Sequence, residues 1–259
     1  MMDTVLLEIG DGVARVTFNR PDRLNAIDLP TLERLVEVLD EASAAAEARV
    51  VVLAGKGRAF CAGADLGEMA ERSPVEWERI VDRYLDPVRS ISRMDKPVIA
   101  SLHGDTFGGG LGLALASDFR IAAEGIRLAA PFVKIGLAGC DMSAGYFLPR
   151  LVGLGRATDL MMTGRSIDAP EAERIGLVTR VVPETELDAA VGQLAQQLAE
   201  GPPRALAFTK RAARRSFDRS MEAEFDYEVF AQVQCLQSED RREGVSAFLE
   251  RRPARFTGE

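Results

Sequence analysis

The chain has few of the side chains from which metal and redox sites are built. Its 259 residues include one histidine, His103, and three cysteines, Cys61, Cys140 and Cys235, which lie far apart and form no Cys-x-x-Cys pair. Zinc sites use closely spaced Cys and His ligands, so the sequence predicts no metal site. A small, odd number of cysteines is typical of a reducing compartment, and we expect a cytoplasmic protein.

Long apolar runs and an excess of positive charge are also missing. No run reaches the ~20 apolar residues that a membrane-spanning helix needs. The chain carries 32 Lys and Arg against 40 Asp and Glu, a net charge of −8, which argues against nucleic-acid and anionic-membrane partners. The one basic stretch, residues 210–219, precedes an acidic one. We interpret it as the solvated face of a helix, with a polyanionic ligand such as a nucleotide tail as the alternative.

Hydrophobic residues make up 47% of the chain, which is enough for a large core. The order of the apolar patterns predicts an α/β fold, with a core of residues 1–200 and a helical segment of residues 201–259. A valine-rich run at 49–54 is typical of a buried parallel strand. Residues 74–91 have the spacing of one long helix, and residues 177–182 have the composition of a strand.

A run of three glycines, Gly108 to Gly110, interrupts the segment 97–116, which begins as a strand and ends as a buried helix from Leu111. Free N–H groups at such a helix start can hold a phosphate or a developing oxyanion. A dinucleotide fingerprint needs a further glycine where Leu113 or Leu115 stands, and no Gly-Lys-Ser/Thr follows. The pattern therefore favours an oxyanion site, with close helix packing as the alternative use of the glycines.

Serine catalysis would have to use the single imidazole. Ser101 lies two residues before His103 and would share its face of a strand. No Gly-x-Ser-x-Gly elbow is present, however. We interpret His103 as a packed residue at the end of a strand.

Four motifs carry a resemblance to a known family. NRPDRLNAID at 19–28, AFCAGADLGEM at 59–69, KPVIASLHGDTFGGGLGLALASD at 96–118 and GLVTRVVPETEL at 176–187 resemble the enoyl-CoA hydratase/isomerase (crotonase) superfamily. The resemblance covers residues 5–256. It implies a spiral of ββα units that forms two nearly perpendicular sheets. It also implies a helical C-terminal segment that assembles homotrimers or dimers of trimers.

The same resemblance implies the substrate and the site. The family binds acyl-CoA thioesters and stabilises a thioester enolate with two backbone N–H groups, which here would be those of Ala64 and Gly109. The substrate itself carries coenzyme A, so no tightly bound cofactor is expected. Residues matching the family's coenzyme A contacts are Arg23, Leu24, Ala62, Asp65, Leu66 and, in the C-terminal tail, Phe256.

The catalytic carboxylates depart from the family's hydratase pattern. Gly112 and Phe132 stand where the hydratases have their two glutamates. Asp141 remains, at a place where relatives that shift double bonds, and aryl-CoA dehalogenases, also carry an aspartate. We expect Asp141 to move protons, with capping of the helix that follows as the alternative or additional role.

Three functions follow from these residues. The favoured one is an isomerase that shifts a double bond of an enoyl-CoA, with Asp141 as the proton shuttle. The second is a hydratase that uses Asp141 and water alone. The third is a crotonase homologue that binds acyl-CoA without turning it over.

Overall fold

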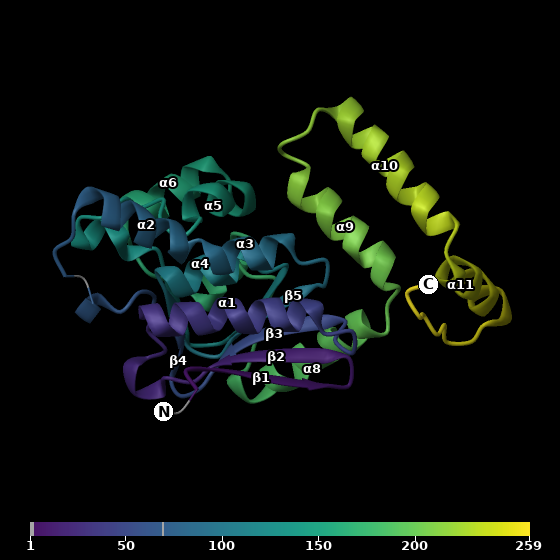
Figure 1. Cartoon of the computed structure of the whole chain (residues 1–259), viewed down its shortest axis with the longest axis horizontal. Coiled ribbons are helices and arrows are strands. Elements are labelled where there is room, and N and C mark those ends of the chain that lie inside the picture. Colours follow the sequence, from purple (N-terminus) through teal and green to yellow (C-terminus); the bar gives the residue numbers. More distant parts are fainter. Residues whose placement is uncertain (1–2, 69) are drawn as a thin grey trace.

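The computed structural model describes residues 3–68 and 70–259, and within them ten strands form two sheets (Figure 1). In sheet order, the six-stranded sheet contains β1 (Val5–Gly10), β2 (Val13–Phe18), β3 (Val50–Gly55), β5 (Val98–Leu102), β7 (Phe119–Ala123) and β10 (Arg180–Val182). The four-stranded sheet contains β4 (Ala59–Cys61), β6 (Asp105–Phe107), β8 (Arg127–Ala129) and β9 (Ile167–Asp168). Only the outer pairs β1–β2 and β8–β9 are antiparallel.

The chain passes three times from the large sheet to the small one, in the pairs β3–β4, β5–β6 and β7–β8. A helix follows each pair before the next strand of the large sheet is reached. This confirms the expected spiral of ββα units. Its consequence for the site is that the loops after β4 and β6, neighbours in the small sheet, lie side by side.

Helices cover both faces of the large sheet (Figure 1). α8 packs against β2, β3, β5 and β7, and α1 lies on the opposite side. The helices of this body are α1 (Leu29–Ala44), α2 (Pro74–Tyr84), α3 (Asp86–Arg93), α4 (Gly109–Ala116), α5 (Ala144–Val152), α6 (Leu154–Thr163), α7 (Ala169–Arg174) and α8 (Leu187–Ala199). Short 3-10 helices are η1 (Pro21–Arg23), η2 (Leu66–Glu68), η3 (Pro131–Ile135) and η4 (Glu184–Glu186).

The core lies between these helices and the large sheet. Val50, Val51 and Leu53 of β3 are completely buried, which confirms the parallel strand expected at 49–54. Every residue of α4 is buried as well, because this helix of Gly, Ala and Leu lies in the middle of the molecule.

The last three helices form an arm that extends away from the sheets (Figure 1). The arm consists of α9 (Pro203–Arg215), α10 (Met221–Leu236) and α11 (Glu239–Glu250). α10 buries none of its residues, although apolar side chains recur along it at helical spacing. The exposed apolar residues of α10 and α11 include Met221, Phe225, Val229, Val233, Leu236, Phe248 and Leu249. None of the described helices is both long and apolar enough to cross a membrane.

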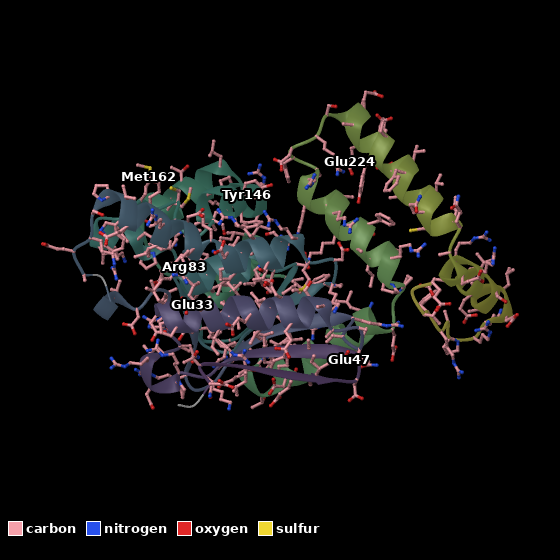
Figure 2. All side chains as sticks on the ribbon, viewed as in Figure 1. Glu33, Glu47, Arg83, Tyr146, Met162 and Glu224 are labelled. Atoms are coloured by element: carbon pink, nitrogen blue, oxygen red, sulfur yellow. The ribbon has the colours of Figure 1, made fainter. Side chains whose placement is uncertain are left out.

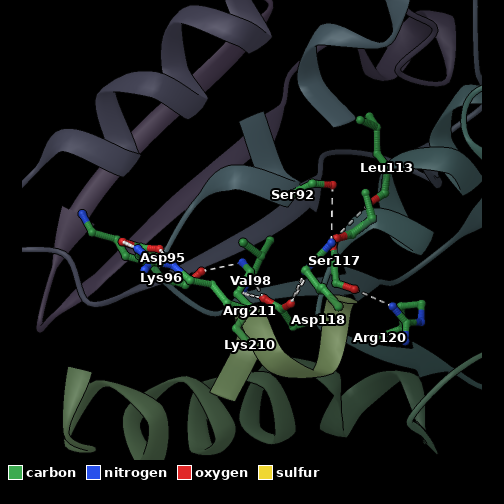
Figure 3. Close-up of polar contacts among 12 residues, drawn as sticks. Ser92, Asp95, Lys96, Val98, Leu113, Ser117, Asp118, Arg120, Lys210 and Arg211 are labelled. Atoms are coloured by element: carbon green, nitrogen blue, oxygen red, sulfur yellow. Dashed lines mark hydrogen bonds and ion pairs between the residues drawn. The ribbon is translucent and has the colours of Figure 1, made fainter. Parts of the chain in front are cut away.

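An ion cluster connects α9 to the rest of the molecule, and Figure 3 labels three of its residues, Val98, Asp118 and Lys210. Asp118, just after α4, accepts a hydrogen bond from the backbone N–H of Val98. The same carboxylate pairs with Lys210 and Arg214 of α9, each at 2.8 Å. Lys210 is 8% exposed. The expectation of a solvated face for residues 210–219 is therefore wrong for Lys210 and Arg214, which turn inward to a half-buried carboxylate.

The long helix expected at 74–91 is two helices. α2 ends at Tyr84, and α3 starts at Asp86 with Pro87 in its first turn. Proline has no N–H to donate and its ring clashes with the preceding turn, so Pro87 favours a break between the two helices.

Two strand expectations also change. Only Arg180–Val182 of the segment 177–182 is a strand, because Leu177 and Val178 donate to the Ala172 carbonyl at the end of α7. The segment 97–116 contains two strands, β5 and β6, which belong to different sheets. Its helix begins at Gly109, two residues before the expected start.

The first prediction concerns pH and Lys210, whose pKa burial lowers to about 8. In the unfolded chain the pKa is about 10.4, so between these values the unfolded state binds more protons and stability rises with pH. Chemical denaturation from pH 8 to 10 should show the free energy of unfolding rising relative to Lys210→Met, by at most about 1.4 kcal/mol per pH unit. The same dependence of the unfolding free energy on pH in the wild type and in Lys210→Met would contradict this prediction.

The second prediction concerns the exposed apolar stripe of α10. We expect α10 to form a subunit interface, because an exposed apolar stripe of this size is typical of one. Since the family resemblance implies trimers or dimers of trimers, analytical ultracentrifugation should give the mass of three or six subunits. Val229→Asp places a charge in the stripe and should dissociate the assembly. Gln193→Asp, on exposed α8 surface, is the matched control and should not. A monomeric wild-type protein would show that the arm does not assemble subunits.

Candidate active site

A cavity of about 500 Å³ opens between α2, the N-terminal end of α4 and the segment 131–142. Most of the residues that line it are apolar. It brings together six of the site residues expected from the sequence, namely Ala62, Ala64, Asp65, Leu66, Gly109 and Asp141.

The two expected backbone donors lie in adjacent loops of this cavity. Gly109 is the first residue of α4, and Ala64 follows Gly63 in the loop after β4. A Cβ built on Gly63 would come within 3.0 Å of the Gly109 nitrogen, so the two loops are in backbone contact. In the described part of the chain, the N–H groups of Ala64 and Gly109 donate to no acceptor. Two free donors at a helix start can stabilise negative charge in the cavity.

Asp141 lies in a tight turn that precedes α5. Its Oδ1 accepts a hydrogen bond from the backbone N–H of Met142 at 2.7 Å, and its Oδ2 has no partner among the described residues. The N-cap position of α5 belongs to Ser143, whose side chain makes no capping bond. The capping interpretation of Asp141 is therefore wrong. Its carboxylate lines the cavity with one oxygen unengaged.

Apolar groups occupy the two places where the hydratases carry glutamates. The Phe132 ring lies in the cavity wall, 3.7 Å from where a Cβ on Gly108 would stand. Gly112 packs against the Met142 backbone, and the Met142 side chain covers Gly109. Phe147 of α5 does not line this cavity and lies near Arg214 of α9. The walls beside the two donors are therefore Phe132 and Met142.

A network of polar contacts shapes the loop that carries the expected coenzyme A residues. Arg20 pairs with Asp28 at 2.8 Å and with Asp65 at 3.4 Å, and the other oxygen of Asp65 accepts from Gly67 N–H. The Asn25 side chain donates to carbonyls of residues 56, 59 and 60. Sequence reasoning missed Arg20 and Asn25, because nothing in a loop sequence shows that its side chains bind backbone across the fold.

Leu24 and Arg23 lie outside the cavity, in the loop held by Asn25. The Leu24 carbonyl accepts from Ala62 N–H, so Leu24 borders the cavity-lining residues. Arg23 is exposed at the end of η1.

Phe256 does not join this cavity. Its ring packs against Gly244 of α11, and its carbonyl accepts a hydrogen bond from Arg49. Asp240 binds the N–H groups of Thr257 and Gly258 and so fixes the tail. Within one subunit, the tail is therefore held beside the arm and away from the cavity.

The outer wall of the cavity is formed by α2. The sequence predicts a longer helix at this place and does not identify it as part of the site. Trp77, Ile80 and Tyr84 line it from one face of α2. Figure 2 shows Arg83 of α2 beside Glu33 of α1, and the two form an ion pair of 2.5 Å. Tyr84 donates from its hydroxyl to the Ile27 carbonyl. These contacts hold the α2 wall over the Ala64 loop.

Other chemically active side chains lie elsewhere. His103 contacts the Gly57 carbonyl through its ring nitrogen at 2.9 Å and does not line the cavity. Cys61 is fully buried, and burial raises the pKa of its thiol to about 12. Residues 3–68 and 70–259 contain no group of three or more His, Cys, Asp or Glu that could hold a metal ion.

Comparisons with known proteins agree with this geometry. A family model described as enoyl-CoA hydratase/isomerase matches residues 8–259. The short-chain-enoyl-CoA hydratase of Clostridium acetobutylicum is 34% identical over 252 residues, which cover 97% of this chain and 96% of that protein. The 1,2-epoxyphenylacetyl-CoA isomerase of Escherichia coli (strain K12) is 35% identical over 262 residues, which cover all of both chains.

Solved structures show the same relationship. The crystal structure of an enoyl-CoA hydratase from Bacillus anthracis superimposes with a TM-score of 0.93 at 34% sequence identity, and the match covers 99% of this chain and 100% of that one. Fold and sequence thus agree over nearly the whole chain. The chain belongs to the enoyl-CoA hydratase/isomerase (crotonase) family of acyl-CoA enzymes.

Proposed function

We propose that this enzyme shifts the double bond of an enoyl-CoA from C3–C4 to C2–C3. The observation that carries the proposal is the set of carboxylates in the cavity. Among the described lining side chains only Asp65 and Asp141 carry one, and Asp65 is bound to Arg20 and Gly67. Asp141 is left as the acid–base group, in the same cavity as the two free backbone donors.

The thioester oxygen would accept hydrogen bonds from the N–H groups of Ala64 and Gly109. Removal of a proton from C2 places negative charge on this oxygen. The two donors and the N-terminal end of α4 stabilise that charge more strongly than the neutral thioester, which lowers the barrier. Losing one donor of such a pair typically slows a reaction by about 10²–10³-fold.

Asp141 would supply both proton transfers. Its carboxylate takes the proton from C2, and the electrons of that bond form a dienolate with the thioester. The carboxylic acid then returns the proton to C4, so the double bond ends between C2 and C3 and the enzyme is unchanged. One group is sufficient, since the proton that leaves is the proton that returns.

Hydration needs more than this cavity offers. A water molecule must be activated for attack at C3 while a proton is delivered to C2, and the family's hydratases use two glutamates for this. Here Gly112 and Phe132 replace them, and the walls near the donors are apolar. Hydration by Asp141 and water alone remains the second candidate, since the relatives include a short-chain-enoyl-CoA hydratase as well as an isomerase of another acyl-CoA, 1,2-epoxyphenylacetyl-CoA.

Coenzyme A would lie along the loops that flank the cavity mouth. Ala62, Asp65 and Leu66 offer backbone groups there, and Leu24 lies behind Ala62. Arg23 is exposed near this loop. Phe256 could contribute only from a second copy of the chain, since its own tail is fixed beside α11. The substrate brings coenzyme A with it, and no tightly bound cofactor is required.

The third prediction is that Asp141→Asn abolishes isomerisation. Replacing a carboxylate by an isosteric amide removes the base but preserves shape, so kcat with a 3-enoyl-CoA should fall by about 10²–10⁴-fold. Calorimetry should find the Kd for a saturated acyl-CoA unchanged. Full activity in this variant would refute the assignment of Asp141. A wild-type protein that binds acyl-CoA but converts no enoyl-CoA would instead show a non-catalytic homologue.

The fourth prediction compares the two reactions in the wild-type enzyme. Isomerisation of 3-enoyl-CoA should have a larger kcat/KM than hydration of the matching 2-enoyl-CoA, because a second catalytic carboxylate is missing. Both rates can be followed by absorbance and product chromatography at equal enzyme concentration. A larger kcat/KM for hydration would favour the second candidate.

A further inference from the structure

The glycine in place of the first hydratase glutamate is in backbone contact with the Asp141 turn. A Cβ built on Gly112 would lie 2.3 Å from the Met142 carbonyl oxygen and 2.8 Å from the Met142 Cβ. Outside its own residue and its two chain neighbours, a real Cβ atom essentially never has another heavy atom within 3.0 Å. The turn in its present place therefore requires that residue 112 has no side chain.

The turn itself is strained. Met142 and Ser143 have φ values of 48° and 67°, the left-handed region that residues other than glycine rarely adopt. Such backbone conformations persist where contacts with the surrounding structure hold them in place. α4 is one of these surroundings, through Gly112. α6 is the other, since a Cβ on Gly139 would lie 2.3 Å from the Met161 carbonyl oxygen.

The direction of the Asp141 carboxylate depends on this turn. Asp141 Oδ1 accepts the hydrogen bond of the Met142 peptide N–H at 2.7 Å. The carbonyl of the same residue, Met142, is the group in contact with Gly112. A shift of Met142 away from α4 therefore carries the carboxylate with it.

We propose that Gly112 is a positioning residue: its missing side chain lets Met142 pack on α4 and so holds the Asp141 carboxylate toward the oxyanion donors. The inference rests on the proposed role of Asp141 in proton transfer. It also means that a side chain at 112 and the present Asp141 turn exclude each other. A misplacement of about 1 Å at a reacting group can slow a reaction by about 10²-fold.

The test compares Gly112→Ala with Gly155→Ala. Gly155 lies in α6 with nothing within 4 Å of a built Cβ, so it controls for a glycine-to-alanine change in a helix. With a 3-enoyl-CoA, Gly112→Ala should have a kcat at least about tenfold below that of Gly155→Ala. The Kd for a saturated acyl-CoA should differ far less between the two variants than kcat does, since the atoms nearest to a Cβ on residue 112 belong to Met142 and not to the loops expected to bind coenzyme A.

A second pair of variants changes the Asp141 turn itself and leaves the sequence of α4 as it is. Met142→Ile and Met142→Leu are isomers, but the β-branched isoleucine is far less compatible with a φ of 48°. The isoleucine variant should lose several-fold more kcat than the leucine variant. If circular dichroism shows that Gly112→Ala does not fold, the kcat values of the two Met142 variants test the positioning role instead.

Asp141→Asn, measured alongside, separates the two proposals. If it is inactive while Gly112→Ala keeps the kcat of Gly155→Ala, the positioning role is overturned and the proposed function stands. If Gly112→Ala does not fold, equal kcat values for the two Met142 variants likewise overturn the positioning role. If Asp141→Asn is fully active, both proposals fail.

Discussion

Close backbone contact at the N-terminal end of α4 is the constraint on which the site depends. A Cβ on Gly110 would lie 2.2 Å from the Cys61 carbonyl oxygen, and one on Gly112 would lie 2.3 Å from that of Met142. α4 can therefore touch the β4 strand on one side and the Asp141 turn on the other. Glycine in a helix costs about 1 kcal/mol relative to alanine, and here complete burial of the helix offsets it.

Ion pairs connect the segments around the site, and few charged side chains line the cavity itself. Arg20 binds Asp28 and Asp65 at the loop beside the cavity, and Asp118 binds Lys210 and Arg214 at the base of the arm. These ion pairs join loops and helices around the site, while most of the residues that line the cavity are apolar.

Much of this could be predicted from the sequence, because some signals are local. The valine run of β3 and the glycine run at the start of α4 specify their own structure, and the resemblance of the motifs to the crotonase family pointed to Ala64, Gly109 and Asp141, which line the cavity. Contacts between distant segments could not be predicted. Nothing near Lys210 in sequence indicates that it faces Asp118, and the sequence at Gly112 shows only a missing glutamate. The meaning of that glycine depends on a carbonyl thirty residues further along the chain.

The most direct test of the account is a crystal structure with a bound, unreactive enoyl-CoA analogue. The account predicts the thioester oxygen about 2.7–3.1 Å from the backbone nitrogens of both Ala64 and Gly109. It also predicts the Asp141 carboxylate over the C2–C4 segment of the acyl chain, close enough to reach both carbons. A thioester oxygen bound elsewhere, or an Asp141 carboxylate turned away from the acyl chain, would contradict it.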